Sequence, residues 1–334
     1  MKRSTIFALI FAIAIAATAS SGLSRVLAQQ APSPGSGQAL EISPTLVTLD
    51  ADPGEELTLQ VRLRNVSSEA LIVSGEINDF LAGDELGAPR VIMEEDMEEF
   101  ADNPYSIREW IDSVPEILLE PGEIETLTAT INVPANASPG GHYGVIRFSG
   151  TPPELEDTGV SLAASVGTLV LLTVSGDITE AAEVEEFTVM KDGETPRLFE
   201  SQPLQLVQRI RNTGNVHIQV RGQVFIKDMF DRDLAAANVN LSQQNILPDS
   251  VRRFEQDIDS SLIGNKRLFG RYTANLELTY GDEQTISDTI TFWVIPYRLI
   301  GGIILAVIIV SLGIWIMLKR YRRRILKQAR RRRY

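Results

Sequence analysis

Short runs of alternating apolar and polar residues fill most of the chain between residues 40 and 296. In one run, Leu57, Leu59, Val61 and Leu63 alternate with polar residues, as expected of a strand with one buried face. Turn-forming triplets such as Asp52-Pro53-Gly54 separate these runs, and helical periodicity is almost absent. The pattern predicts an all-β protein built from antiparallel sheets.

The alternating region divides near residues 175–182 into two parts of sandwich size. Residues 40–176 contain a repeated strand-Pro-Gly-Glu-strand arrangement and the stretch SPGGHYGVIRFSG, where Tyr143, Val145 and Phe148 are expected to face inward. Residues 177–296 contain strong alternating runs joined by turns at Asp192-Gly193 and Gly281-Asp282. We therefore expect two immunoglobulin-like β-sandwiches in series, 40–176 and 177–296.

The two ends of the chain differ in kind from this body. Residues 1–28 have a basic start, an apolar run and small residues, the pattern of a signal peptide, with an uncleaved anchor as the alternative. Residues 29–39 are rich in Pro, Gly and Ser, which is typical of a flexible leader. Residues 297–318 form an apolar run long enough for a transmembrane helix, and residues 319–334 form a basic tail.

Charge is distributed unevenly along the chain. Of 334 residues, 44 are acidic and 31 basic, and ten of the basic residues lie after residue 318. Positive residues beside a membrane span stay on the cytoplasmic side, so we expect a single-pass type I protein with its bulk outside the cell and its C-terminus inside. The acidic body disfavours nucleic acid as a partner. There is no cysteine, which excludes disulfides and thiolate sites.

Candidate catalytic groups are few. The two histidines, His142 and His217, fall in different predicted sandwiches and each begins a strand, so neither predicts a metal site or a catalytic triad. Acid pairs such as Glu154/Glu156 and Glu183/Glu185 have a spacing of two, which places both carboxylates on one exposed strand face. We expect no enzyme activity and no cofactor, and an acid-pair hydrolase is the least favoured alternative.

The insert between Leu81 and Val114 interrupts the alternation. Its acidic stretch 94–102 lacks the spacing of a known calcium loop, so a solvated loop is favoured over a cation site. The aromatic binding candidates are Tyr105 and Trp110 in this insert and Phe225 and Phe230 near residues 226–240, with core packing as the alternative for each.

The order of segments resembles a known family. A signal peptide, a sandwich opening with ISPTLVTLDADPGEELTLQVRLRN, the entry PGGHYGVIRFSG, a sandwich with IRNTGNVHIQVRGQVFIKD, one membrane helix and a basic tail are similar to the WxL-interacting surface proteins of Gram-positive bacteria, the domain-of-unknown-function 916 type. That resemblance implies peptidoglycan binding by the outer sandwich and a small WxL protein as partner. The acidic 94–102 insert departs from the family.

These observations predict a membrane-anchored surface protein for binding and display, in contact with a cell-wall polymer and another surface protein. The alternative is a membrane-tethered chaperone or an assembly subunit of a pilus or secretion machine, which would act by pairing a sheet edge with its client.

Overall fold

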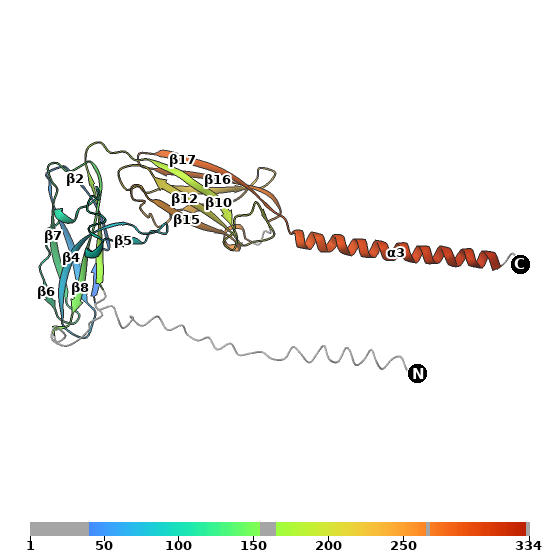
Figure 1. Ribbon diagram of the computed structural model, residues 1–334, viewed down its shortest axis with the longest axis horizontal. Coiled ribbons are helices and arrows are strands. Elements are labelled where there is room, and N and C mark those ends of the chain that lie inside the picture. Colours follow the sequence, from blue (N-terminus) through green and yellow to red (C-terminus); the bar gives the residue numbers. More distant parts are fainter. Residues whose placement is uncertain (1–39, 154–164, 265–267, 332–334) are drawn as a thin grey trace. The chain divides into compact units, whose positions relative to one another are not determined.

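A computed structural model describes residues 40–153, 165–264 and 268–331, with side chains up to residue 320 in the C-terminal helix (Figure 1). The predicted signal peptide, the leader and Glu154/Glu156 lie outside the described residues. Strands dominate the described chain, which confirms the all-β prediction, and one apolar helix follows them near the C-terminus.

The first sandwich is made of two facing sheets. One sheet has the order β1-β3-β7 and the other the order β2-β9-β8-β4-β5, with β6 paired to β4. The first strand is divided between the sheets, because β1 pairs with β3 whereas β2 pairs with β9 in parallel. The strands are β1 Leu40–Ser43, β2 Leu46–Ala51, β3 Glu56–Asn65, β4 Leu71–Ala82, β5 Pro89–Val91, β6 Ile117–Leu119, β7 Ile124–Asn132, β8 Gly140–Thr151 and β9 Ser165–Val174.

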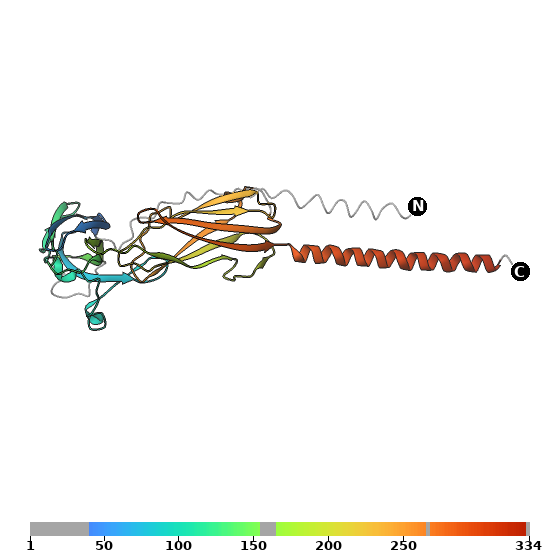
Figure 2. The same ribbon diagram turned by 90° about the horizontal axis from the view of Figure 1, so that it is seen from above.

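The second sandwich repeats this topology. One sheet has the order β10-β12-β15 and the other the order β11-β17-β16-β13-β14, and β11 again pairs in parallel with the last strand. Figure 2 shows this sandwich, coloured yellow-green to orange, followed by the helix near the C-terminus. The strands are β10 Ala182–Met190, β11 Leu198–Phe199, β12 Leu204–Asn212, β13 Arg221–Lys227, β14 Asp233–Val239, β15 Val251–Ile258, β16 Gly270–Tyr280 and β17 Gln284–Val294. A short helix, α2 Ser260–Ile263, follows β15.

The alternation seen in the sequence sets the core of each sandwich. In β3 the residues Leu59, Val61 and Leu63 are buried and their neighbours are exposed, as predicted. In β7 the inner face is Leu127, Ala129 and Ile131. Ile124 is exposed, because it differs in parity from these residues and therefore points to the outer face of the strand.

One prediction about the direction of side chains is wrong. Ile146 and Phe148 of β8 lie in the core of the first sandwich, whereas Tyr143 and Val145 point to the other face of the sheet. There they form a separate cluster with Phe80 and Leu171. Residues 143 and 145 differ from residue 148 in parity, so they cannot share a strand face with it.

A buried asparagine closes the same corner in both sandwiches. After β3, the Asn65 side-chain amide donates to the Glu69 and Leu119 carbonyls at 2.7 and 2.9 Å, and its oxygen accepts from Ser67 N at 2.9 Å. After β12, Asn212 donates to the Val216 and Ile246 carbonyls at 2.8 and 2.9 Å and accepts from Gly214 N at 2.9 Å. Both asparagines are fully buried. Each one satisfies backbone groups that a turn would otherwise leave unpaired.

The insert after β4 is mostly irregular. Two short 3-10 helices lie in it, η1 Glu94–Asp96 and η2 Arg108–Trp110. Trp110 packs against the core of the first sandwich and its ring lies 4.4 Å from that of His142.

The C-terminal helix α3 Tyr297–Arg331 begins three residues after β17 ends. Its segment Tyr297–Arg320 is long and apolar enough to cross a membrane, and its side chains are exposed. The predicted span 297–318 lies within this segment.

Candidate binding site at the junction of the sandwiches

The β4–β5 hairpin ends in a turn formed by residues 83–88. The Asp84 carboxylate accepts from Gly87 N at 2.7 Å and from Ala88 N at 2.9 Å, and Gly83 N donates to the Ala88 carbonyl at 2.8 Å. These amides, with Ala88 first, hold the pKa of Asp84 below its usual value. Gly87 has a φ of +93° and lies against the Arg252 guanidinium, where a β-carbon would clash. The turn is therefore fixed in shape and closely packed against the second sandwich.

Glu85 at the tip of this turn binds an arginine of β12. Arg209 donates through Nε to Glu85 Oε2 at 2.8 Å and through Nη2 to Oε1 at 2.5 Å, a bidentate pair. The Arg209 hydrogen bond lowers the pKa of Glu85 and raises that of Arg209. The backbone of the turn takes part too, because Arg253 N donates to the Glu85 carbonyl at 2.7 Å and Arg252 Nη2 to the Leu86 carbonyl at 3.2 Å.

Aromatic groups form a second set of contacts at the junction. The Tyr105 hydroxyl donates to Asp249 Oδ2 at 2.8 Å, and the Tyr143 hydroxyl lies 3.5 Å from His217 Nδ1. Burial, with the Asp249 hydrogen bond, raises the pKa of Tyr105 to about 12, and burial also raises that of Tyr143. Burial lowers the pKa of His217 to about 4, against a smaller opposing effect of Asp50. The His217 imidazole is therefore neutral at pH 7.

Asn215, in the turn between β12 and β13, joins the linker to both sandwiches. Its carbonyl accepts from Gly141 N at 2.8 Å. Its side chain accepts from Thr179 N at 2.8 Å and donates to the Asp177 carbonyl at 2.9 Å. Gly140 has a φ of +120°, and a β-carbon there would lie 2.5 Å from the Asn215 carbonyl oxygen. The Gly140-Gly141 start of β8 is thus also a contact between the sandwiches.

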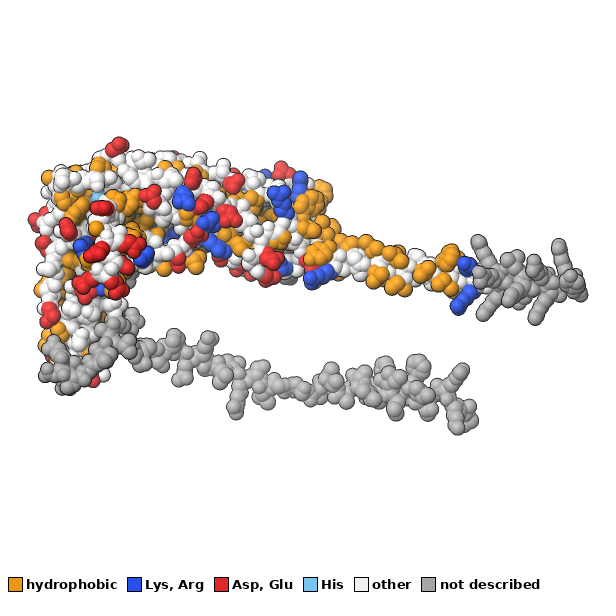
Figure 3. All heavy atoms as spheres, viewed as in Figure 1, with side chains coloured by type: hydrophobic (Ala, Val, Ile, Leu, Met, Phe, Trp, Pro, Cys, Tyr) orange, Lys and Arg blue, Asp and Glu red, His pale blue; other side chains and the backbone are white. Residues whose placement is uncertain are grey.

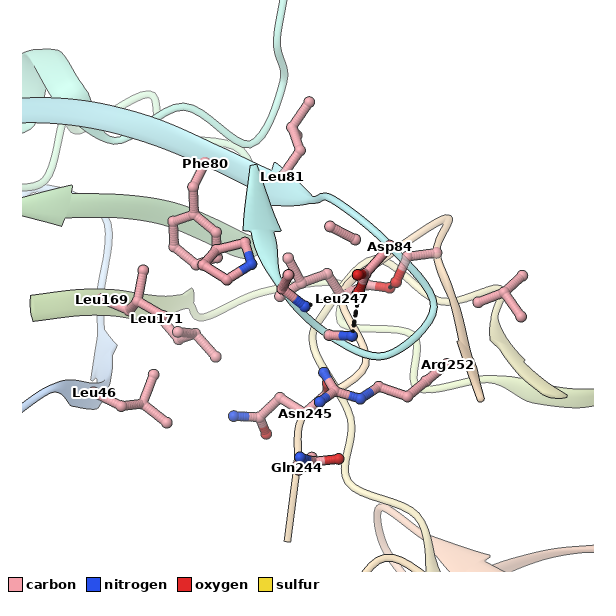
Figure 4. A pocket seen from close by; sticks show the side chains of 16 residues that line it. Leu46, Phe80, Leu81, Asp84, Leu169, Leu171, Gln244, Asn245, Leu247 and Arg252 are labelled. Carbon is pink, nitrogen blue, oxygen red and sulfur yellow. Dashed lines mark hydrogen bonds between the residues drawn. The ribbon is translucent and has the colours of Figure 1, made fainter. Parts of the chain in front are cut away.

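A groove of about 180 Å³ lies beside these contacts (Figure 4). Its apolar side is formed by Phe80 of β4, Leu46 of β2 and Leu169 and Leu171 of β9. The opposite side comes from the β14–β15 loop and the start of β15, including Gln244, Asn245, Leu247 and Arg252. Leu46 has 44% of its surface exposed, so the apolar wall opens to solvent. Such a groove fits a partner segment that places apolar side chains against the apolar wall and polar groups against the side-chain amides of Gln244 and Asn245.

The four aromatic candidates do not gather at one place. Tyr105 is half-buried at the junction and Trp110 is half-buried against the first core. Phe225 is half-buried on β13, while Phe230 lies in the β13–β14 turn with 68% of its surface exposed and the Arg232 guanidinium 5.1 Å from its ring. Only Tyr105 touches the junction contacts described above.

The other sequence candidates lie apart from the groove. His142 is buried and its Nε2 lies 2.9 Å from the Ser138 carbonyl. Glu183 and Glu185 of β10 both pair with Arg211, at 3.7 and 3.0 Å, on a solvated strand face. In the insert, Asp96 pairs with Arg90 at 3.6 Å. Across the residues that the structure describes, no cluster of three or more His, Asp or Glu side chains is arranged to hold a metal ion.

Sequence reasoning missed Glu85, Arg209, Arg252 and Asp249. Each is an ordinary polar residue on a turn or a strand, and Glu85 and Arg209 are 124 residues apart. Only the Asp-Glu-Leu-Gly turn after a strongly apolar strand marks the hairpin as unusual, and it does not say what the tip contacts.

No protein-family model and no curated protein sequence matches this chain. Among solved structures, it is similar to the class 5 fimbriae chaperone CfaA at 13% identity, covering 75% of this chain and 98% of that one, with a TM-score of 0.37. It is also similar to the E. coli chaperone DraB at 11% identity, covering 76% and 96%, with a TM-score of 0.33. The PapD-like domain 7 of human CEP192 matches at 13% identity over 47% of this chain and 97% of that one, with a TM-score of 0.30.

Proposed function

We propose that this chain is a membrane-anchored surface protein that binds another protein at the junction of its two sandwiches and carries out no catalysis. The observation that carries the proposal is the open groove with an apolar wall on β2, β4 and β9 and an amide-bearing wall from the second sandwich. A surface of this kind favours a partner segment with alternating apolar and polar groups.

The polar groups at the junction support binding rather than turnover. Glu85 and Arg209 pair with each other, Tyr105 with Asp249, and Asp84 with backbone amides. These groups hold the two walls of the groove in register. A preformed groove loses less conformational entropy when a partner binds.

The anchor is α3. Its 24-residue segment Tyr297–Arg320 matches the thickness of a bilayer, and the basic residues 319–334 favour the cytoplasmic side. In this proposal the sandwiches lie outside the cell. The resemblance to WxL-interacting proteins suggests a small WxL protein as the partner and peptidoglycan as a neighbour of the outer sandwich, and both remain parts of the proposal.

Site-specific crosslinking in cells tests the groove. The full-length protein carries p-benzoylphenylalanine in place of Leu46, with Leu118 as the matched position. Leu118 is 55% exposed on β6, which pairs with β4 at the end far from the groove. Irradiation should give one protein adduct of defined mass from position 46 and none from position 118. Adducts at neither position, or the same adducts at both, contradict the proposal, and a polydisperse sugar-containing adduct would indicate a wall polymer as the ligand.

A second candidate function rests on the edge of β9. β2 pairs with β9 only from Leu169 onward, and Leu169 N donates to the Thr45 carbonyl at 2.9 Å. Among the described residues no strand pairs with Ser165–Thr168 on that side, although Thr168 Oγ1 donates to the Pro44 carbonyl at 2.7 Å. An open edge can pair with a strand of a client protein, as an assembly factor requires.

A proline substitution at the edge of β9 distinguishes binding in the groove from pairing of a client strand with this edge. Backbone groups of odd-numbered residues in this part of β9 face the open side, because Leu169 N does so. Ser165→Pro should therefore remove an edge donor and keep the pairing with β8, while Ser165→Ala serves as the control. Loss of client assembly with the proline variant alone would support the assembly function. Unchanged assembly would leave the groove as the binding site.

A further inference from the structure

Six large apolar side chains are exposed at the end of the second sandwich where α3 begins. We call them the base patch, and they are Leu198, Met229, Phe230, Phe269, Trp293 and Tyr297. In Figure 3, orange apolar side chains gather at this end, with blue basic side chains among them. Soluble protein surfaces usually expose large apolar residues singly, so a group of six indicates a surface that binds a partner.

Strand pairing places these residues together. Trp293 of β17 lies opposite Leu198 of β11 and opposite Arg271 of β16. Met229 packs against Gly270, where a β-carbon would clash with its Cε. Phe269 directly precedes Gly270, and its amide donates to the Tyr272 hydroxyl at 3.0 Å. Four separate chain segments thus bring their apolar side chains to one end of one sheet.

The start of α3 is bound to the same end. Ile295 N donates to the Phe199 carbonyl at 2.8 Å, and Arg298 Nε lies 3.2 Å from Glu200 Oε2. Trp293 is four residues from Tyr297, so their α-carbons are at most about 14 Å apart even in a fully extended chain. Tyr297 belongs to the base patch and is also the first residue of the apolar segment, so the patch is directly continuous with this segment.

The charges around the patch suit a lipid surface. Arg197 and Arg271 are exposed, and among the described residues neither takes part in an ion pair. Two nearby acids are paired with arginines, Asp228 with Arg232 at 2.6 Å and Glu200 with Arg298 at 3.2 Å. Asp231 pairs with Lys227 at 3.7 Å. Free guanidinium groups beside Trp, Tyr and Phe are the combination that membrane headgroup regions favour.

We infer that the base patch lies in the headgroup region of the bilayer that α3 enters, so that the second sandwich rests on the membrane surface. The inference depends on the proposed anchorage by α3 and adds a second, interfacial contact to it. The partner is the phospholipid surface itself. The aromatic rings enter the interface, and Arg271 and Arg197 bind lipid phosphates.

Tryptophan quenching by lipid tests this contact in the full-length chain. The protein has three tryptophans, of which Trp315 lies in the apolar segment. Single-tryptophan variants keep Trp293 (Trp110→Phe with Trp315→Phe) or Trp315 (Trp110→Phe with Trp293→Phe). A third carries Leu241→Trp as its only tryptophan. Leu241 is 78% exposed just after β14, at the opposite end of the same sheet. Each is reconstituted in vesicles of phosphatidylcholine with 30% phosphatidylglycerol, with and without lipid brominated near the headgroup.

Trp293 should be quenched at least threefold more strongly than the tryptophan introduced by Leu241→Trp. Quenching of Trp315 without quenching of Trp293 would leave the anchorage intact and overturn the base patch. Absence of quenching at both would overturn the anchorage and the patch together. A third outcome is that lipid does not quench Trp293 and that its exposure to solvent falls as the protein concentration rises. This outcome would show that a second copy of the chain covers the patch, and it would also overturn the proposal.

Charge reversal gives an independent measurement. In the Trp293-only background, Arg271→Glu should reduce the quenching at least twofold in the anionic vesicles. Arg221→Glu, an exposed arginine at the far end of β13, should leave it unchanged. Equal quenching in the two variants would contradict the role assigned to Arg271.

Discussion

The two sandwiches share one strand order but differ in what covers their larger sheet. In the first, the outer face of β2-β9-β8-β4-β5 carries Tyr143, Val145 and Leu171, which are buried with Leu247 of the second sandwich. In the second, Leu198 of β11, Trp293 of β17 and Arg271 of β16 lie side by side on neighbouring strands, and all three are exposed. The same fold therefore presents either a protein-covered or an open face, and the side chains on that face decide which.

Substitution of the two buried asparagines should destabilise the sandwiches more than any other substitution considered. Asn65→Ala removes four hydrogen bonds made by a buried side chain, and Asn212→Ala removes three. We expect each to lower the free energy of unfolding by about 3 kcal/mol. Denaturant unfolding of the full chain in detergent measures this. Similar losses would show that the two corners are equivalent, and a loss well below about 1 kcal/mol at either would contradict the structural role.

Acid should weaken the junction through His217. Its pKa falls from the usual 6.5 to about 4 on burial, so the unfolded or separated form binds the proton more readily. The junction is thus fully stable above pH 6.5 and loses stability as the pH falls from 6.5 toward 4, by about 3 kcal/mol in total. The measurement is the melting temperature against pH for the wild type and for His217→Asn, which does not titrate. A constant difference between the two curves over this range would rule out His217 as the cause.

The Glu85–Arg209 pair should contribute less, because both side chains keep part of their surface in water. A double-mutant cycle of Glu85→Gln and Arg209→Gln should give a coupling energy of about 1 kcal/mol. Proteolysis of the 175–182 linker reports separation of the sandwiches and should be faster in both single variants. An unchanged cleavage rate would mean that the aromatic and backbone contacts hold the junction without this pair.

The smallest effect is expected at Glu183. It pairs with Arg211 at 3.7 Å on an exposed face, so the chemistry resembles the Glu85 pair without its bidentate geometry or its position between sandwiches. Glu183→Gln should change the free energy of unfolding by less than about 0.5 kcal/mol in the same denaturant experiment. An effect as large as that of Glu85→Gln would show that geometry and position are not what distinguish the pairs.

Local signals in the sequence predicted much of the fold. Alternation gave the inner faces of β3 and most of β7, and Asp192-Gly193 forms a turn with positive φ at both residues. Alternation failed at β8, because HYGVIRF has apolar residues on both faces and both faces are buried. A strand covered on both sides has no polar row to mark its orientation.

The candidate site was beyond sequence reasoning for a different reason. Its contacts join residues of one sandwich to distant residues of the other, as with Tyr105 and Asp249 or Gly141 and Asn215. None of these residue types is unusual in its own segment. Pairing of this kind depends on how two finished domains dock, which periodicity and turn chemistry do not encode.

The direct joint between β17 and α3 has a mechanical consequence. In the proposed anchorage, a pull on α3 enters the second sandwich at Val294, the last residue of β17. β17 runs antiparallel to β16 from Gly270 to Tyr280 and is flanked by the parallel β11 at its loaded end. A pull along β17 strains these backbone hydrogen bonds in shear, many at once, instead of opening them one by one. The strand that delivers the load is therefore among the best secured in the molecule.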